Sequence, residues 1–125
     1  MMSRANKKET NRLEEGESVM NAKEFMDATY KRDVYNIRPR AVCADGFSMS
    51  IQGGTRGHYC VPRKLCREYQ KVEIGFPSEI EPLLLPYAEE EETPTETVYG
   101  FVEMDVVEEV VKKHGGIIDY AGKED

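Results

Sequence analysis

The chain has no tryptophan, only two histidines and three cysteines, and none of its apolar runs approaches the ~20 residues that a membrane-spanning helix needs. An odd set of cysteines cannot form a complete disulfide framework, and free thiols agree with a reducing compartment. The basic N-terminal segment lacks the apolar stretch of a secretory signal. We therefore expect a cytoplasmic protein with no membrane contact.

Motifs that would mark an enzyme are also missing. Neither the G-x-G-x-x-G dinucleotide loop nor the G-x-x-x-x-G-K-[ST] phosphate loop occurs. Cys60 and His58 are two residues apart and share a face if they lie on a strand, but nothing marks the thiol as an activated nucleophile. The carboxylates gather in an acidic loop and on a helix surface, where strongly shifted pKa values are not expected. The sequence predicts no enzyme, no catalytic residue and no cofactor.

A metal site is the next candidate, because four soft ligands occur in one region. They are His58, Cys60, Cys66 and Cys43. The His58-x-Cys60 and Cys60-x₅-Cys66 spacings differ from the C-x₂₋₄-C knuckle of structural zinc sites. We therefore expect buried or half-buried thiols and no bound metal.

The length of 125 residues suits one domain. We expect a flexible leader over 1–20, a single domain over 21–117 and a loose tail over 118–125. Asn21 suits the N-cap of a helix over 22–31. Alternating apolar and polar residues flank Asp45-Gly46, which predicts a hairpin with a two-residue type I′ turn and Phe47, Met49 and Ile51 on its inner face.

The second half of the chain predicts further strands and one strong helix. We expect a short strand over 58–61, a strand over 69–76 with Val72, Ile74 and Phe76 on one face, a brief helix start at 77–79 and a strand over 97–102. Asp105 and Glu108 have capping-box spacing before a valine stripe, and Gly115 suits the helix stop. The predicted fold is α+β: a small antiparallel sheet of about four to five strands packed against two helices.

The charges are strongly divided along the chain. Residues 31–67 carry a net charge of +6, and residues 68–109 carry −12. Chance segregation of surface charges is one interpretation. In another, the basic part binds an anion such as a nucleotide; in a third, the acidic part occupies a basic nucleic-acid groove of another protein. The candidate partner-binding carboxylates of the third interpretation are Glu73, Glu79, Glu81, Glu89, Glu90, Glu91, Glu92, Glu96 and Glu103.

A second candidate set surrounds the glycine-rich stretch 53–57. Serines on the polar face of one predicted strand, backbone donors of the loop, arginine charge and a tyrosine for stacking together suit a nucleotide ligand. These residues are Arg38, Arg40, Ser48, Ser50, Gln52, Arg56, His58, Tyr59 and Arg63. The alternative is that they form the solvated face of an antiparallel sheet.

Four segments resemble a group of small uncharacterised proteins of phages and prophages. They read RPRAVCADGFSMSIQGG (38–54), HYCVPR (58–63), VEIGFPSEIEPLLLPYAE (72–89) and TETVYGFV…VVEEVVKKHGGI (95–117). The resemblance assigns no catalytic residue. It implies a bacterial host cell and a role against host immunity, either as an anti-CRISPR inhibitor of an effector nuclease or as a sponge for a nucleotide second messenger. The sponge favours a homo-oligomer, and a minor structural or regulatory phage protein stays open.

Overall fold

A computed structural model describes residues 19–31, 37–54, 58–63 and 66–123. In chain order, the elements are α1 (Ala22–Ala28), β1 (Ala41–Cys43), β2 (Ser48–Gln52), β3 (Lys71–Gly75), the 3-10 helix η1 (Leu85–Tyr87), β4 (Val98–Glu103), α2 (Met104–Lys113) and β5 (Ile117–Asp119). The strands form one antiparallel sheet in the order β4-β3-β2-β1-β5. The predicted α+β fold with a small antiparallel sheet and two helices is confirmed.

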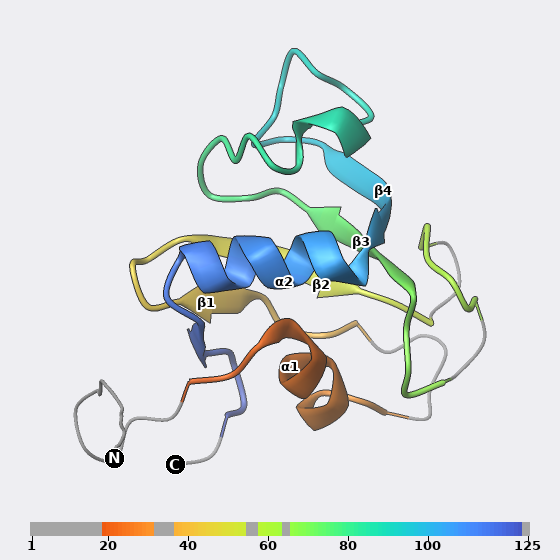
Figure 1. Cartoon of the computed structure of the whole chain (residues 1–125), viewed down its shortest axis with the longest axis vertical. Helices are drawn as coiled ribbons and strands as arrows, with labels where there is room; N and C mark the ends of the chain where they lie inside the picture. Colours follow the sequence, from red (N-terminus) through yellow and green to blue (C-terminus); the bar gives the residue numbers. More distant parts are fainter. Residues whose placement is uncertain (1–18, 32–36, 55–57, 64–65, 124–125) are drawn as a thin grey trace.

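The core lies between one face of the sheet and the two helices. Met49, Ile51, Val72 and Ile74 point from β2 and β3 into this layer, because alternate residues of a strand share a face. α2 lies across the sheet in Figure 1 and contributes three fully buried valines of the predicted stripe, Val107, Val110 and Val111. Val106 is only partly buried.

α1 begins where the sequence predicts. Asn21 is its N-cap: the Asn21 side chain accepts from the Glu24 amide, and the Glu24 carboxylate accepts from the Asn21 amide. The helix is shorter than the expected 22–31, since it ends at Ala28. Met20, at the end of the expected leader, already exchanges two backbone hydrogen bonds with Ile117; residues 1–18 lie outside the described residues.

The β1–β2 hairpin forms at the predicted place, but its turn differs. Its loop has three residues, Ala44–Gly46, closed by a hydrogen bond from the Cys43 amide to the Phe47 carbonyl. Only Gly46 has a positive φ, of 96°. A type I′ turn needs two consecutive residues with positive φ, so the expected two-residue turn is wrong and a three-residue loop ending in a left-handed glycine takes its place.

Three further expectations around β3 need correction. Of the expected strand over 58–61, only Val61 pairs, with Lys71. Phe76 does not share the inner face of Val72 and Ile74: its φ of 49° turns it outward, and it is exposed. No helix starts at 77–79; the first helical residues of the β3–β4 connection are Leu85–Tyr87.

The C-terminal part also differs from the prediction. The capping box of Asp105 and Glu108 does not form: Glu103 is the N-cap of α2 and makes no side-chain cap hydrogen bond. Gly115 ends the helix with a φ of 92°, as expected. The residues after Gly116 are not a loose tail from the start, because Ile117–Asp119 form β5 beside β1.

Candidate functional site

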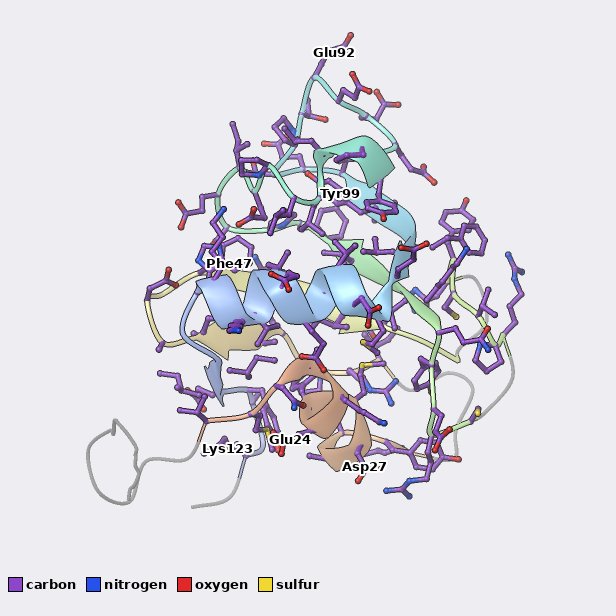
Figure 2. The ribbon with its side chains drawn as sticks, viewed as in Figure 1. Glu24, Asp27, Phe47, Glu92, Tyr99 and Lys123 are labelled. Carbon is purple, nitrogen blue, oxygen red and sulfur yellow. The ribbon has the colours of Figure 1, made fainter. Side chains whose placement is uncertain are left out.

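The connection between β3 and β4 forms one end of the molecule, opposite α1 (Figure 1). Residues 89–96 of this connection, which we name the acidic loop, carry Glu89, Glu90, Glu91, Glu92 and Glu96, all exposed. Figure 2 shows Glu92 at the outermost turn. No lysine or arginine occurs between Lys71 and Lys112, so no basic residue of the same stretch of sequence offsets these charges.

The acidic loop is held in one conformation by hydrogen bonds at its base and inside it. The Glu89 amide donates to the Val98 carbonyl at 3.0 Å, and the Glu90 amide donates to Thr97 Oγ1 at 3.1 Å. Within the loop, the Thr93 amide donates to the Glu90 carbonyl at 3.2 Å. The hydroxyl of fully buried Tyr99 donates to the Pro94 carbonyl, and burial raises the pKa of this phenol. The carboxylates are therefore presented by an ordered segment.

Two members of the predicted acidic set lie inside the protein instead. Glu73 is buried on β3, with its Oε1 2.6 Å from Nδ1 of His58. Glu81 is 1% exposed. Neither carboxylate is available to a partner, so the acidic surface consists of the other members: Glu79, Glu89, Glu90, Glu91, Glu92, Glu96 and Glu103 are all exposed.

Glu81 is the centre of an ionic cluster in which Glu81 and His114 are buried, whereas the side chains of Lys113 and Asp45 are about half exposed. Its Oε1 lies 2.7 Å from His114 Nε2, and its Oε2 accepts from Lys113 Nζ at 2.9 Å and from the Leu83 amide at 3.0 Å. On its other side, His114 Nδ1 lies 2.7 Å from Asp45 Oδ2. Burial alone would raise the pKa of Glu81, but the Leu83 amide, His114 and Lys113 outweigh it and hold that pKa below its ordinary value.

The predicted nucleotide-binding set is divided between the interior and the surface. The Arg38 guanidinium is buried and donates to Thr29 Oγ1 at 2.8 Å and to the carbonyls of Gly53 and Met26 at 3.1 and 2.9 Å. Gln52 is also buried and pairs with the backbone of Arg38 through both ends of its amide. Arg38 thus holds the end of α1 to the residue that follows β2, and Gln52 fixes the backbone of Arg38 against β2; both tasks are structural.

The remaining members do not converge on one described cavity. Arg40 is exposed and binds Ser48 Oγ together with the carbonyls of Ser48 and Phe76. Ser50 is half-buried and accepts from the Gln52 side chain. Tyr59 packs on β4, and β3 separates it from the serines of β2. Arg63 is exposed, His58 pairs with Glu73, and Arg56 lies outside the described residues.

The cysteines behave as the sequence predicts for free thiols. Cys43 and Cys60 are buried, and Cys66 is partly exposed. Burial, and secondarily the negative charge of Asp45, raises the pKa of Cys43 to about 11. In the described part of the chain, no group of three or more His, Cys, Asp or Glu side chains has an arrangement that could hold a metal ion.

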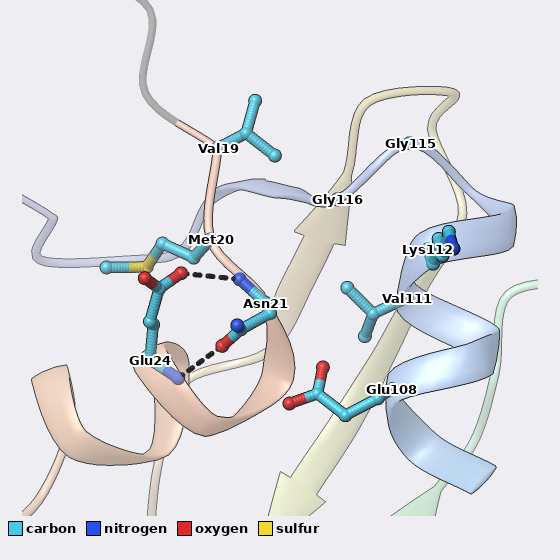
Figure 3. Close-up of a pocket in the computed structure, with 9 residues that line it drawn as sticks. All are labelled: Val19, Met20, Asn21, Glu24, Glu108, Val111, Lys112, Gly115 and Gly116. Atoms are coloured by element: carbon cyan, nitrogen blue, oxygen red, sulfur yellow. Dashed lines mark hydrogen bonds between the residues drawn. The ribbon is translucent and has the colours of Figure 1, made fainter. Parts of the chain in front are cut away.

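A pocket of about 620 Å³ lies where the start of α1 meets α2 (Figure 3). Val19, Met20 and Val111 form apolar parts of its wall. Its acidic side chains already have partners: Glu24 belongs to the capping box, and Glu108 accepts from the amides of Ala22 and Lys23 at 2.8 and 3.0 Å. These groups stabilise the start of α1, and the pocket has no free cluster that would define a ligand.

Sequence reasoning missed the ionic cluster and the aliphatic side chains beside it. Glu81 and Asp45 lie 33 and 69 positions before His114, so no local pattern joins them. Counting charges along the chain also cannot tell an exposed carboxylate from a buried one. Two prolines and three leucines near Glu81 gave the only available signal that this acidic stretch is partly apolar.

Among the described residues, no helix is both long enough and apolar enough to cross a membrane. Comparison of the chain with protein-family models, with curated proteins and with solved structures finds no match in any of the three.

Proposed function

We propose that the protein acts by stoichiometric binding and that its acidic loop occupies the nucleic-acid groove of a basic partner protein. The observation that carries this proposal is the ordered display of five exposed carboxylates at one end of the molecule. Grooves that bind nucleic acids concentrate Lys and Arg side chains against the phosphate charge. A loop whose backbone is already ordered complements such a groove and loses less backbone conformational entropy on binding than a flexible loop would.

The partner class that we propose is an RNA-guided effector nuclease, which makes the protein an anti-CRISPR inhibitor. Such nucleases hold the guide–target duplex in a positively charged channel. The resemblance of four segments to small phage proteins supports an anti-defence role. The sponge has weaker support, because the Arg38 side chain of its predicted site holds the end of α1 and the Gln52 side chain binds the backbone of Arg38. No observation favours a structural phage role.

The test is DNA cleavage by a panel of purified RNA-guided effector nucleases that spans the known effector types, each titrated with the protein. We expect one of them to lose activity near one equivalent, and the inhibition to weaken at least about tenfold between 0.05 and 0.2 M salt, because ion pairs with the groove are screened. Absence of inhibition across the panel would contradict the proposed class of partner.

Two double variants of equal charge change locate the surface. E91Q/E92Q removes two charges from the acidic loop, and E68Q/E109Q removes two exposed charges from elsewhere. Two lost charge contacts correspond to roughly tenfold weaker inhibition, since each exposed pair contributes up to about 1 kcal/mol. E68Q/E109Q is expected to inhibit like the wild type. Equal inhibition by both variants would rule out the acidic loop as the binding surface.

A further inference from the structure

The residues Ile80–Leu83 place a carboxylate inside the protein and two aliphatic side chains outside it. Glu81 is 1% exposed, whereas Ile80 is 58% and Leu83 is 42% exposed. Water favours the opposite arrangement, because large aliphatic side chains gain free energy on burial and a carboxylate loses it unless it is paired. The hydrophobicity of this segment therefore does not explain its conformation, and the buried acid beside exposed aliphatics requires another reason.

The partners of Glu81 impose this arrangement. His114 and Lys113, at the end of α2, bind the two carboxylate oxygens at 2.7 and 2.9 Å. The Leu84 amide donates to the Glu81 carbonyl at 3.0 Å and closes the turn, with Pro82 inside it. Glu81 points inward in this geometry, and Ile80 and Leu83 on either side are held outward.

These aliphatic side chains and the acidic loop belong to one segment of the chain, the connection between β3 and β4. This connection forms the end of the molecule opposite α1 (Figure 1). Exposed Glu79 directly precedes Ile80. Protein interfaces typically place apolar anchors in pockets of the partner and surround them with polar or charged residues. The negative charge of Glu79 and the acidic loop attracts a basic protein surface and repels an acidic one.

We propose that Ile80 and Leu83 are apolar anchors of the partner-binding surface. They enter a hydrophobic pocket in the partner, while Glu79 and the carboxylates of the acidic loop contact Lys and Arg side chains around that pocket. This inference rests on the proposed function and deepens it. The partner offers a basic surface that contains an apolar pocket, and a uniform row of positive charge does not suffice.

Two synthetic helical peptides serve as probes. They have the same length and the same number of lysines, and one carries leucine on one helix face where the other carries serine. Fluorescence anisotropy at 0.15 M salt, a physiological ionic strength, measures their binding to the wild type, I80S/L83S, E91Q/E92Q and the control I37S, which changes an exposed isoleucine elsewhere. Urea unfolding of each variant confirms that it is folded.

We expect the wild type and I37S to bind the leucine peptide at least tenfold more tightly than the serine peptide. I80S/L83S is expected to lose this preference, and E91Q/E92Q is expected to weaken the binding of both peptides. If wild type and I80S/L83S bind the leucine peptide equally, Ile80 and Leu83 are not anchors. Binding of both peptides would in that case still support an acidic docking surface. If neither peptide binds the wild type, the anchors and the acidic surface both fail.

Discussion

His114 Nε2 lies 2.7 Å from Oε1 of Glu81, and both side chains are buried. The other ring nitrogen of His114 lies 2.7 Å from Asp45 Oδ2. A neutral imidazole has one N–H and can donate to only one of these carboxylates, so the geometry fits the charged imidazolium, which donates to both. Burial alone lowers the pKa of His114, but the hydrogen bonds to Glu81 and Asp45 outweigh it, and this pKa lies above its ordinary value. The cluster joins the β1–β2 hairpin, the β3–β4 connection and the end of α2.

The free energy of unfolding should therefore be greatest at mildly acidic pH. The raised pKa of His114 gives stability that is fully present below the unfolded-state value of about 6.5 and is lost as the pH rises through the folded-state pKa. The Phe47 amide, then His114, lowers the pKa of Asp45, and the pKa of Glu81 is lowered as well. The stability from these two acids is present above about pH 4 and is lost as the pH falls through their folded-state values. Urea unfolding as a function of pH measures both the loss of stability at alkaline pH, which His114 causes, and the loss at acidic pH, which Asp45 and Glu81 cause.

The variant H114Q isolates the loss of unfolding free energy at alkaline pH. It should be less stable than the wild type at pH ~6 and should show a smaller loss between pH ~6 and ~9, because the group that titrates is gone. An alkaline loss of equal size in H114Q and wild type would assign the effect to another group.

Arg38 should contribute as much to the free energy of unfolding as buried hydrogen bonds of a charged group typically do. R38K cannot reproduce three hydrogen bonds to Thr29 Oγ1 and the carbonyls of Met26 and Gly53. We expect the free energy of unfolding to fall by about 1.5–3 kcal/mol. The exposed control R63K should stay within about 0.5 kcal/mol of the wild type. Equal stability of R38K and R63K would show that Arg38 is free for another task.

Glu108 should stabilise the start of α1 (Figure 3), because both of its oxygens accept backbone amides there. Glutamine offers one acceptor and no charge, so E108Q should lose about 1 kcal/mol of unfolding free energy. E109Q, one position along the same helix and exposed, should lose almost none. Circular dichroism during urea unfolding compares the two variants, and an equal loss in both would contradict the capping role.

The three thiols should differ in their reaction with iodoacetamide at neutral pH. Cys43 is buried with a pKa of about 11, and Cys60 is fully buried, so neither presents an accessible thiolate in the folded protein. Cys66 is partly exposed and should be modified first. Mass spectrometry should find one adduct in the folded protein and three after unfolding. Rapid native modification of Cys43 would contradict the packing of β1.

The structural features that the sequence predicts correctly depend on residues that are close together in the sequence. Asn21 caps α1 through a partner three positions away, and the valine stripe of α2 follows helical spacing. The features that sequence reasoning missed depend on distant partners. Glu108 suits a capping box with Asp105, but it binds the amide of Ala22, 86 positions away, because the fold brings both helices together. β5 was missed because three residues form a strand only when β1 offers its edge.

The same distinction explains the outcome for the candidate sites. The glutamates of the acidic loop follow one another in the sequence, so their exposure in a loop was predictable. Glu73 and Glu81 look identical to them by charge and are buried because His58 and His114 bind them. Arg38 looks like a ligand-binding arginine, yet the carbonyl at the end of α1 that it satisfies appears only in the folded protein.

Hydrogen exchange of the protein, alone and in complex with the effector nuclease proposed as its partner, tests directly whether residues 79–96 form the binding surface. We expect binding to slow amide exchange in residues 79–96, the segment of the two proposed aliphatic anchors and the acidic loop. Protection confined to the surface of Arg40, Ser48 and Ser50, with unchanged exchange in residues 79–96, would contradict it.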